Sequence, residues 1–355
     1  MKNNEFSNIR ITENINESID NAIDNGIERA SMELKSKKSK KRKIAIGITA
    51  ACLGLLFALG AINPALASKL PIVGNVFQSI EKNVYFPGNY SQYATSVNEM
   101  VSNNGINVTL SDILCDGEGL YVTYIVESEK PFKYTSWGDK PLTMNQLITR
   151  EAYNKVSFSK KELDNTGFAG LEGKFINENT FIGMERYYLK SLETEIPNTF
   201  DFQVKLTSIG TKGLREKDKD QNFNGTWAFK VPVKVDKSIS KNIAVNYKGA
   251  NGVSLDSITI TPFSVVVNST NPNYFIRVFD DNNNELKPDM SKKFNENKEI
   301  SYFSAIHKGC KTLRIVVYKN ILEKGETVKN SDGSSSTGYK DVGDEILIDK
   351  SIIIE

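Results

Sequence analysis

Residues 44–62 read IAIGITAACLGLLFALGAI, and the block KSKKSKKRK at residues 35–43 stands directly before them. A helix of nineteen uncharged residues is about 28 Å long, which matches the hydrocarbon core of a bilayer. We therefore predict a transmembrane helix with Ile44 and Ile62 as its end residues. The alternative is a helix buried in a soluble core, but such a helix is expected to be shorter or to show a polar face.

Charge on the two sides of this span predicts its orientation. Residues 35–43 hold seven basic groups, whereas the eighteen residues after Ile62 hold only Lys69. Because Lys and Arg resist translocation, the N-terminus is expected in the cytosol and the long C-terminal part outside the membrane. A cleavable signal peptide is the competing interpretation, since Ala65-Leu66-Ala67 has the small-x-small form of a cleavage site. Its N-terminal region would exceed forty residues, so we favour an uncleaved anchor and keep regulated cleavage after Ala67 as an alternative.

The cytosolic part, residues 1–43, carries isoleucines four residues apart at positions 11, 15, 19, 23 and 27. Side chains at this spacing share one helix face, so the pattern predicts an amphipathic helix. Its other face is acidic, which disfavours an anionic membrane surface and favours the groove of a protein partner. The predicted partner-binding residues are Ile15, Ile19, Ile23 and Ile27. The alternative is a solvated tether in which the isoleucine spacing is a coincidence.

Beyond the membrane the apolar period changes from near four to two. Residues 72–80 keep helical spacing and predict one short helix, and residues 105–127 predict a hairpin that turns at Asp116-Gly117-Glu118-Gly119. Residues 144–153 are interpreted as a helical turn, and Pro232 indicates an edge strand or a bulge. Further strands are predicted at residues 173–182, 186–192, 199–206, 226–235, 253–261, 263–269, 274–279, 298–307, 312–318 and 345–354.

The predicted fold is mainly β, with the cytosolic helix, one transmembrane helix and two extracytoplasmic β-sandwich domains of Ig-like type. A sequence echo, Val235-Asp-Lys-Ser-Ile239 and Ile348-Asp-Lys-Ser-Ile352, is consistent with two domains of related design. Residues 329–338 are expected to form a long hairpin loop. The predicted segments are 1–43 cytosolic, 44–62 transmembrane, 63–100 juxtamembrane connector, 101–238 first sandwich and 239–355 second sandwich.

Charge and cysteine content exclude several classes of protein. The chain has a formal charge of +2, and residues 1–43 contain ten of its 45 basic and seven of its 43 acidic groups. The remainder is balanced at 35 basic against 36 acidic groups, which is not a nucleic-acid surface. Three cysteines give no disulfide framework, so Cys115 and Cys310 are predicted to be small buried residues rather than a pair.

No catalytic constellation is present. His307 is the one histidine, and no nucleophile-elbow, Walker or Cys-x-x-Cys pattern accompanies it, so it is interpreted as a structural histidine at a strand end. Two acidic runs, beginning at Asp218 and Asp280, open like calcium loops but lack the glycine and the final glutamate of an EF-hand. Both are interpreted as turns. We therefore predict no enzyme activity, no cofactor and no metal.

Several segments together resemble a known bacterial family. They are IDNAIDNGIERA (residues 19–30), the lysine block, the span, NPALASKLPIVGNVFQSIEK (63–82) and GINVTLSDILCDGEGLYVTYIVES (105–128). This arrangement resembles domain-of-unknown-function family 4179, and TWAFKVPVKVDKSISK with VSLDSITITPFSVVVNST (226–241 and 253–270) is similar to the Ig-like domain that commonly accompanies it. The resemblance implies a negative regulator of an extracytoplasmic-function sigma factor. Residues 1–43 contain no His or Cys, so binding of a sigma factor there would be metal-free.

Two functions remain open. In the first, the cytosolic helix sequesters a sigma factor at the cell membrane, and an unknown ligand or protein outside triggers its release. In the second, the chain is a surface-anchored binding or wall-associated protein without a regulatory role. The isoleucine stripe favours the first, because an anchor needs only a few basic residues on the cytosolic side.

Overall fold

The computed structural model divides the chain into two compact units, Met1–Pro71 and Ile72–Glu355. The predicted cytosolic helix, with Ile15, Ile19, Ile23 and Ile27, and the predicted span from Ile44 to Ile62 lie outside the described residues. Among the described residues, no helix is long and apolar enough to cross a membrane. The structure describes residues 75–86, 88–133, 146–165, 170–211, 220–270, 274–295, 297–329 and 335–355, all in the second unit.

The first set of strands forms one antiparallel sheet. Its strands are β1 (Thr95–Asn103), β2 (Ile106–Cys115), β3 (Gly119–Ser128), β4 (Gln146–Val156), β5 (Asp164–Asn165), β6 (Leu171–Asn177), β7 (Thr180–Tyr188), β8 (Thr199–Thr211) and β9 (Gln221–Lys234). The order across the sheet is β1-β2-β3-β7-β6-β4-β8-β9, and β5 pairs with β7. Alternate residues of β9 are buried, as the period of two predicts.

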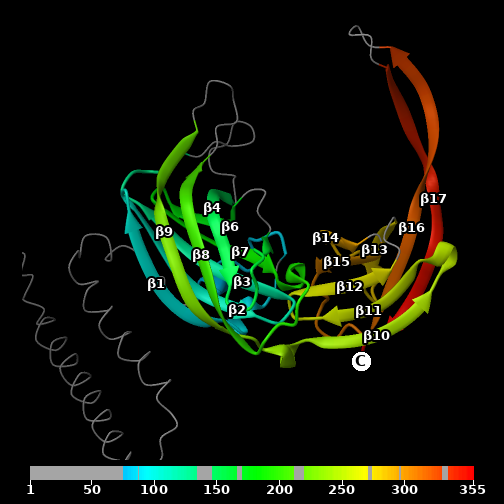
Figure 1. Cartoon of the computed structure of the whole chain (residues 1–355), viewed down its shortest axis with the longest axis horizontal. Coiled ribbons are helices and arrows are strands. Elements are labelled where there is room, and N and C mark those ends of the chain that lie inside the picture. The colour runs from blue at the N-terminus through cyan, green and yellow to red at the C-terminus, as the bar shows by residue number, and fades with distance from the viewer. Residues whose placement is uncertain are drawn as a thin grey trace, which may run out of the picture. The chain divides into compact units, whose positions relative to one another are not determined.

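This nine-stranded sheet curls around its own core, so that the last strand lies beside the first two (Figure 1). Two side chains, one from β9 and one from the turn between β1 and β2, mark the closure. The Trp227 indole Nε1 donates a hydrogen bond of 3.1 Å to the carbonyl oxygen of Ile106. The Asn104 amide Nδ2 donates one of 2.6 Å to the carbonyl oxygen of Asn224. Residues of β2, β3, β8 and β9 therefore share one hydrophobic core.

The second set forms two sheets. Its strands are β10 (Lys241–Lys248), β11 (Ser254–Ile260), β12 (Ser264–Thr270), β13 (Phe275–Phe279), β14 (Pro288–Asn295), β15 (Lys298–Ser304), β16 (Thr312–Lys329) and β17 (Ser335–Ile353). One sheet has the order β10-β11-β12-β15-β14 and the other β13-β16-β17. Both sheets contribute side chains to a second core. The far halves of β16 and β17 continue as a long two-stranded ribbon (Figure 1).

Helices are few. The α-helix α4 (Val76–Ile80) buries three of its five side chains, and the Asn75 side chain caps it by accepting a hydrogen bond of 2.9 Å from the backbone N–H of Phe77. The short 3-10 helices are η2 (Tyr90–Gln92), η3 (Leu189–Leu192), η4 (Lys237–Ile239) and η5 (Ala250–Gly252). The mainly β prediction, the hairpin of β2 and β3, and the short helix near residue 76 are confirmed.

Other local predictions are wrong. The predicted helical turn at residues 144–153 overlaps β4, because pairing with β6 and β8 overrides the local pattern. The predicted strand at 173–182 spans the turn between β6 and β7, where the Asn177 side chain accepts a hydrogen bond from the Asn179 backbone N–H. The predicted strand at 186–192 covers the end of β7 and the 3-10 helix η3. The echoed five-residue segments are not equivalent, because the first contains η4 and the second lies within β17.

Candidate functional site

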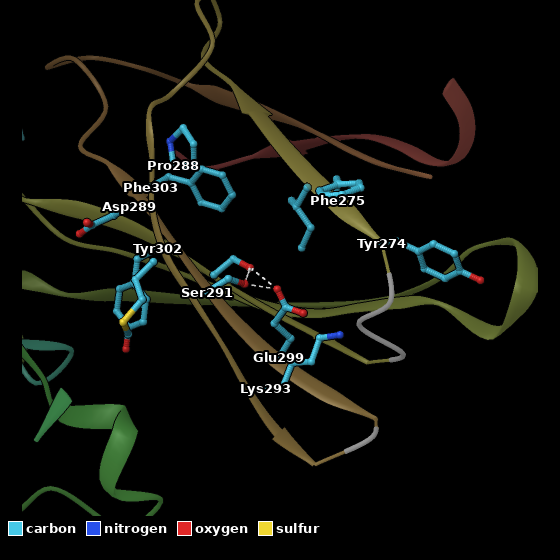
Figure 2. Close-up of a pocket in the computed structure, with 12 residues that line it drawn as sticks. Tyr274, Phe275, Pro288, Asp289, Ser291, Lys293, Glu299, Tyr302 and Phe303 are labelled. Carbon is cyan, nitrogen blue, oxygen red and sulfur yellow. Dashed lines mark hydrogen bonds between the residues drawn. The ribbon is translucent and has the colours of Figure 1, made fainter. Parts of the chain in front are cut away.

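A groove of about 490 Å³ opens between β13 on one side and β14 and β15 on the other. Both β13 and β14 are end strands of their sheets, so each presents an edge that no neighbouring strand covers among the described residues. Figure 2 shows the side chains around this space. The lining residues are Tyr274, Phe275, Ile276, Pro288, Asp289, Met290, Ser291, Lys293, Glu299, Ser301, Tyr302 and Phe303.

The groove combines an apolar wall with one buried carboxylate. Phe275, which is 56% exposed, lies across the groove from Phe303 and Pro288 (Figure 2). On the wall formed by β14 and β15, the Ser291 hydroxyl donates a hydrogen bond to the Glu299 carboxylate. The Ser301 hydroxyl donates a second hydrogen bond, of 3.2 Å, to the same carboxylate. A free strand edge can bind an extended peptide by strand addition, through main-chain hydrogen bonds. The groove is therefore suited to an extended chain or a similarly elongated apolar ligand.

Residue Asp289 of β14 belongs both to this groove and to the contact between the two sets of strands. Its Oδ2 atom lies 3.3 Å from Nη1 of Arg186 in β7, and the Tyr188 hydroxyl donates a hydrogen bond of 2.7 Å to the same oxygen. The second guanidinium nitrogen, Nη2 of Arg186, lies 3.5 Å from Oε1 of Glu172. The guanidinium group also lies 4.5 Å from the centre of the Phe86 ring. Arg186 is thus a buried cation held by two carboxylates and one aromatic ring.

Electrostatics keep this buried cluster charged. Burial by itself lowers the pKa of Arg186, but the Asp289 charge, with Tyr188 and Glu172, outweighs it and leaves the pKa above its ordinary value. Burial raises the pKa of Asp289, whereas Arg186 and the Tyr188 hydroxyl act to lower it. We infer that Asp289 is ionised, because the Arg186 guanidinium keeps its proton and a buried cation needs a charged partner.

An aromatic stack continues from this cluster to the helix that follows the predicted span. Phe263, in the turn between β11 and β12, stacks on Tyr90 with ring centres 4.8 Å apart, and Tyr90 stacks on Phe77 of α4 at 5.6 Å. The backbone N–H of Val76 donates a hydrogen bond of 3.0 Å to the buried carboxylate of Asp112. The beginning of α4 is therefore fixed to both sets of strands.

The turn between β2 and β3 adds a carboxyl group that titrates near neutral pH. Glu118 is buried, and its Oε1 atom lies 3.4 Å from Nζ of Lys190. Burial raises the pKa of Glu118 from 4.5 to about 7, with Lys190 acting in the opposite direction and Asp116 adding to the rise. The folded protein therefore binds this proton more tightly than the unfolded chain does.

We expect Glu118 to make the fold less stable as pH rises. Protonation of Glu118 stabilises the fold fully below its unfolded pKa of 4.5. This stabilisation is lost as the pH rises through the folded pKa of about 7. Between pH 4.5 and 8 the free energy of unfolding should decline by on the order of 1–3 kcal/mol because of Glu118. Glutamine at position 118 cannot ionise, so Glu118→Gln should remove this decline. The measurement is urea unfolding of both proteins at each pH. Parallel pH profiles for the two proteins would contradict the assignment.

The structure places the other sequence-predicted residues as follows. Cys115 and Cys310 are both buried free thiols, as predicted. Asp280 organises a turn, because its Oδ1 atom accepts hydrogen bonds of 2.9 Å and 2.8 Å from the backbone N–H groups of Asn282 and Asn284. His307 follows β15, as expected for a histidine at a strand end. Asp218 lies outside the described residues.

The sequence analysis missed Arg186, Asp289 and Glu172. All three lie in predicted or actual strands, and their side chains meet only when β6, β7 and β14 are brought together. One signal was available, since Glu185-Arg186 places two charges inside a strand whose other residues, apart from Thr180, are apolar or aromatic. Charged side chains inside a buried strand are expected to have buried charged partners.

Comparison with protein families finds one matching region. Residues 37–128 match the family described as Domain of unknown function (DUF4179). The resemblance to domain-of-unknown-function family 4179 is thereby confirmed over residues 37–128, and the regulatory role and the Ig-like domain stay predictions. The DUF4179 region runs from the lysine block through the predicted span and α4 to the end of β3.

Two further comparisons add little to the DUF4179 match. No curated protein matches the chain. A solved structure, the crystal structure of the conserved domain protein from Bacillus anthracis, is similar with 19% sequence identity and a TM-score of 0.49. That match covers 80% of this chain and 100% of the other.

Proposed function

We propose that this protein is a single-pass membrane regulator that sequesters an extracytoplasmic-function sigma factor through its cytosolic helix. In this proposal residues 44–62 span the cell membrane, the N-terminus is cytosolic, and the strand-rich unit lies outside and senses an unknown ligand or protein. The second set of strands is the Ig-like sandwich of the proposed sensor. The lysine block, the apolar run and the DUF4179 match over both support this topology.

The attachment of α4 is the observation that carries the proposal. A signal must pass from the outer unit to the span, and the described chain begins with a helix whose Val76, Phe77 and Ile80 side chains are all fully buried. Phe77 belongs to the same cluster as Phe263, so the helix nearest the span packs on both sets of strands. A segment that only tethers the strand-rich unit to the membrane would not need to pack on both sets of strands.

The groove and α4 are connected by packed residues. A ligand between β13 and β14 would contact Asp289 and Tyr302, and Asp289 pairs with Arg186. Arg186 in turn lies on Phe86, in the segment that follows α4. A shift of β14 on ligand binding would therefore change the surroundings of a buried charge, and packed, charged contacts of this kind can carry coupling between two sites.

On the cytosolic side, the isoleucine stripe supplies the binding energy. Each isoleucine buried in a partner's groove contributes about 1.5–3 kcal/mol of apolar transfer, so four of them can hold a sigma factor without metal. A single aspartate on this face would place a charge in the apolar interface.

We expect the sigma factor to co-purify with the full chain and to be lost with Ile19→Asp. The matched control is Glu17→Gln, which changes the acidic face of the same predicted helix and should retain the partner. Both variants leave the outer unit and the span unchanged, so equal amounts of membrane-inserted protein can be compared. Sequestration would be contradicted if both variants retained the sigma factor, or if the unaltered chain did not bind it.

A surface-anchored binding or wall-associated protein is the second candidate. The groove favours it, because a volume of about 490 Å³ with two free strand edges is sufficient for ligand binding alone. The same co-purification separates the two candidates, since this second function requires no cytosolic partner.

A further inference from the structure

A cluster of three different metal-ligating side chains lies at one end of the second set of strands. Asp281 belongs to the turn after β13, whereas His307 and Cys310 belong to the connection between β15 and β16. One ligand atom from each residue lies within 4.8 Å of the other two. Sequence reasoning did not predict the cluster, because Asp281 and His307 are brought together only by the packing of the two sheets.

The backbone holds the three residues in place. The backbone N–H of Cys310 donates a hydrogen bond of 3.2 Å to the carbonyl oxygen of His307, which closes a four-residue turn. Gly309, with φ of +88°, occupies the turn position that requires a positive φ. The Asp281 Oδ2 atom accepts a hydrogen bond of 2.9 Å from the backbone N–H of Lys311, so the carboxylate is fixed against this turn.

The Nε2 atom of the His307 ring faces the polar side chains of the turn after β13. Its Nδ1 atom lies 3.2 Å from the carbonyl oxygen of Lys308, and a carbonyl can only accept, so Nδ1 carries a proton there. The Nε2 atom lies 2.7 Å from Asp281 Oδ1 and 3.8 Å from Asp280 Oδ2. The Asn282 side-chain Nδ2 also lies 3.0 Å from Nε2 and can donate a hydrogen bond to it. The ring nitrogen that a metal ion would use therefore faces the Asp281 carboxylate.

We propose that Asp281, His307 and Cys310 form a binding site for a divalent zinc-type cation, with Asp281 Oδ1, His307 Nε2 and Cys310 Sγ as its ligands. Mixed oxygen, nitrogen and sulfur ligands suit zinc, which commonly takes three protein ligands and one open position. A tetrahedral ion with bonds of about 2.0–2.3 Å separates neighbouring ligand atoms by about 3.3–3.6 Å. Small side-chain movements convert the present cluster into that geometry.

The hydrogen bond from Nδ1 of His307 to the Lys308 carbonyl would orient the ring, as backbone carbonyls do at metal-bound histidines. On binding, the Cys310 thiol proton and the Nε2 proton pass to solvent, and the ion takes their place. Burial of Cys310, which raises the pKa of its thiol, opposes that loss, and the ion's charge compensates for it.

Such an ion would join two segments that border the groove. Asp281 lies in the connection from β13 to β14, the two edge strands of the groove, and His307 follows β15, which forms part of its wall. Metal occupancy would therefore fix the separation of the groove's walls. This inference does not depend on the sigma-factor proposal.

The test uses the full chain with Cys52→Ser and Cys115→Ser, which leaves Cys310 as its one thiol. Cobalt(II) is added as a spectroscopic probe to protein kept reduced by a phosphine, and zinc is then added to displace it. We expect a cobalt–thiolate charge-transfer band that saturates at about one ion per chain and disappears on addition of zinc.

Ligand variants test the assignment. Added to this background, Cys310→Ser should abolish the band, and His307→Gln and Asp281→Asn should each weaken cobalt binding by at least about 10-fold. The control Asp341→Asn changes an aspartate of β17 whose Oδ1 atom accepts a hydrogen bond of 3.0 Å from the Gly343 backbone N–H, and should leave the titration unchanged. Absence of the band, or a band whose titration is unaffected by both His307→Gln and Asp281→Asn, would overturn the proposal. Those two variants retain Cys310, so the test does not depend on the fold of Cys310→Ser.

Discussion

Replacing Trp227 with alanine should lower the free energy of unfolding of the strand-rich unit by about 3–5 kcal/mol. The indole is fully buried in the first core, and its Nε1 atom donates a buried hydrogen bond to the carbonyl oxygen of Ile106. Its removal leaves a cavity and deletes a buried hydrogen bond where β9 meets β2. The curled sheet would lose the side chain that closes it.

The measurement is urea unfolding of residues 72–355, the compact unit, followed by circular dichroism. Tyr339→Ala serves as the control, because that ring is 64% exposed on the ribbon of β16 and β17. Its removal should change stability by less than about 0.5 kcal/mol. A loss below about 1 kcal/mol for Trp227→Ala would show that the indole does not hold the sheet closed.

The second large effect is expected at Arg186. Arg186→Met keeps much of the side-chain volume but leaves Asp289 and Glu172 without their buried cation, which should destabilise the unit by about 3–5 kcal/mol. Because Asp289 and Arg186 join the two sets of strands, the same variant should loosen the contact between them. Under the proposed function it should also alter signalling from the groove.

An exposed arginine provides the matched control for Arg186. Arg314 pairs with Asp349 in two hydrogen bonds of 2.7 Å and 2.6 Å, but both side chains are 44% exposed. Arg314→Met should therefore cost far less than Arg186→Met, since water solvates the carboxylate that remains. A cycle with Asp289→Asn completes the test: additive effects of Arg186→Met and Asp289→Asn would mean that the two residues do not interact.

The sequence predicted strands best where one face of a strand is buried. In β9, Trp227, Phe229, Val231 and Val233 alternate with exposed residues, so the period of two was visible. Pro232 was correctly placed in an edge strand, because β9 ends its sheet and pairs only with β8 among the described strands. In contrast, every residue of β7 is buried, so that strand shows no alternation and its bounds were missed.

The candidate site could not be predicted in the same way. Arg186 and Asp289 lie 103 positions apart in the sequence, and nothing local shows that β7 and β14 will meet. The groove depends on which strands end each sheet, and β14 itself has no counterpart among the predicted strands. The partner-binding isoleucines, by contrast, follow from spacing alone, and their role stays a prediction.

Transcript levels of the sigma factor's target genes test the central claim most directly. Cells carrying the full chain with Ile19→Asp are compared with cells carrying Glu17→Gln and the unaltered chain, at equal amounts of membrane-inserted protein. Sequestration through the isoleucine stripe predicts strong induction with Ile19→Asp and little change with Glu17→Gln. Unchanged transcripts with Ile19→Asp would contradict the regulatory account and leave the surface-anchored binding protein in its place.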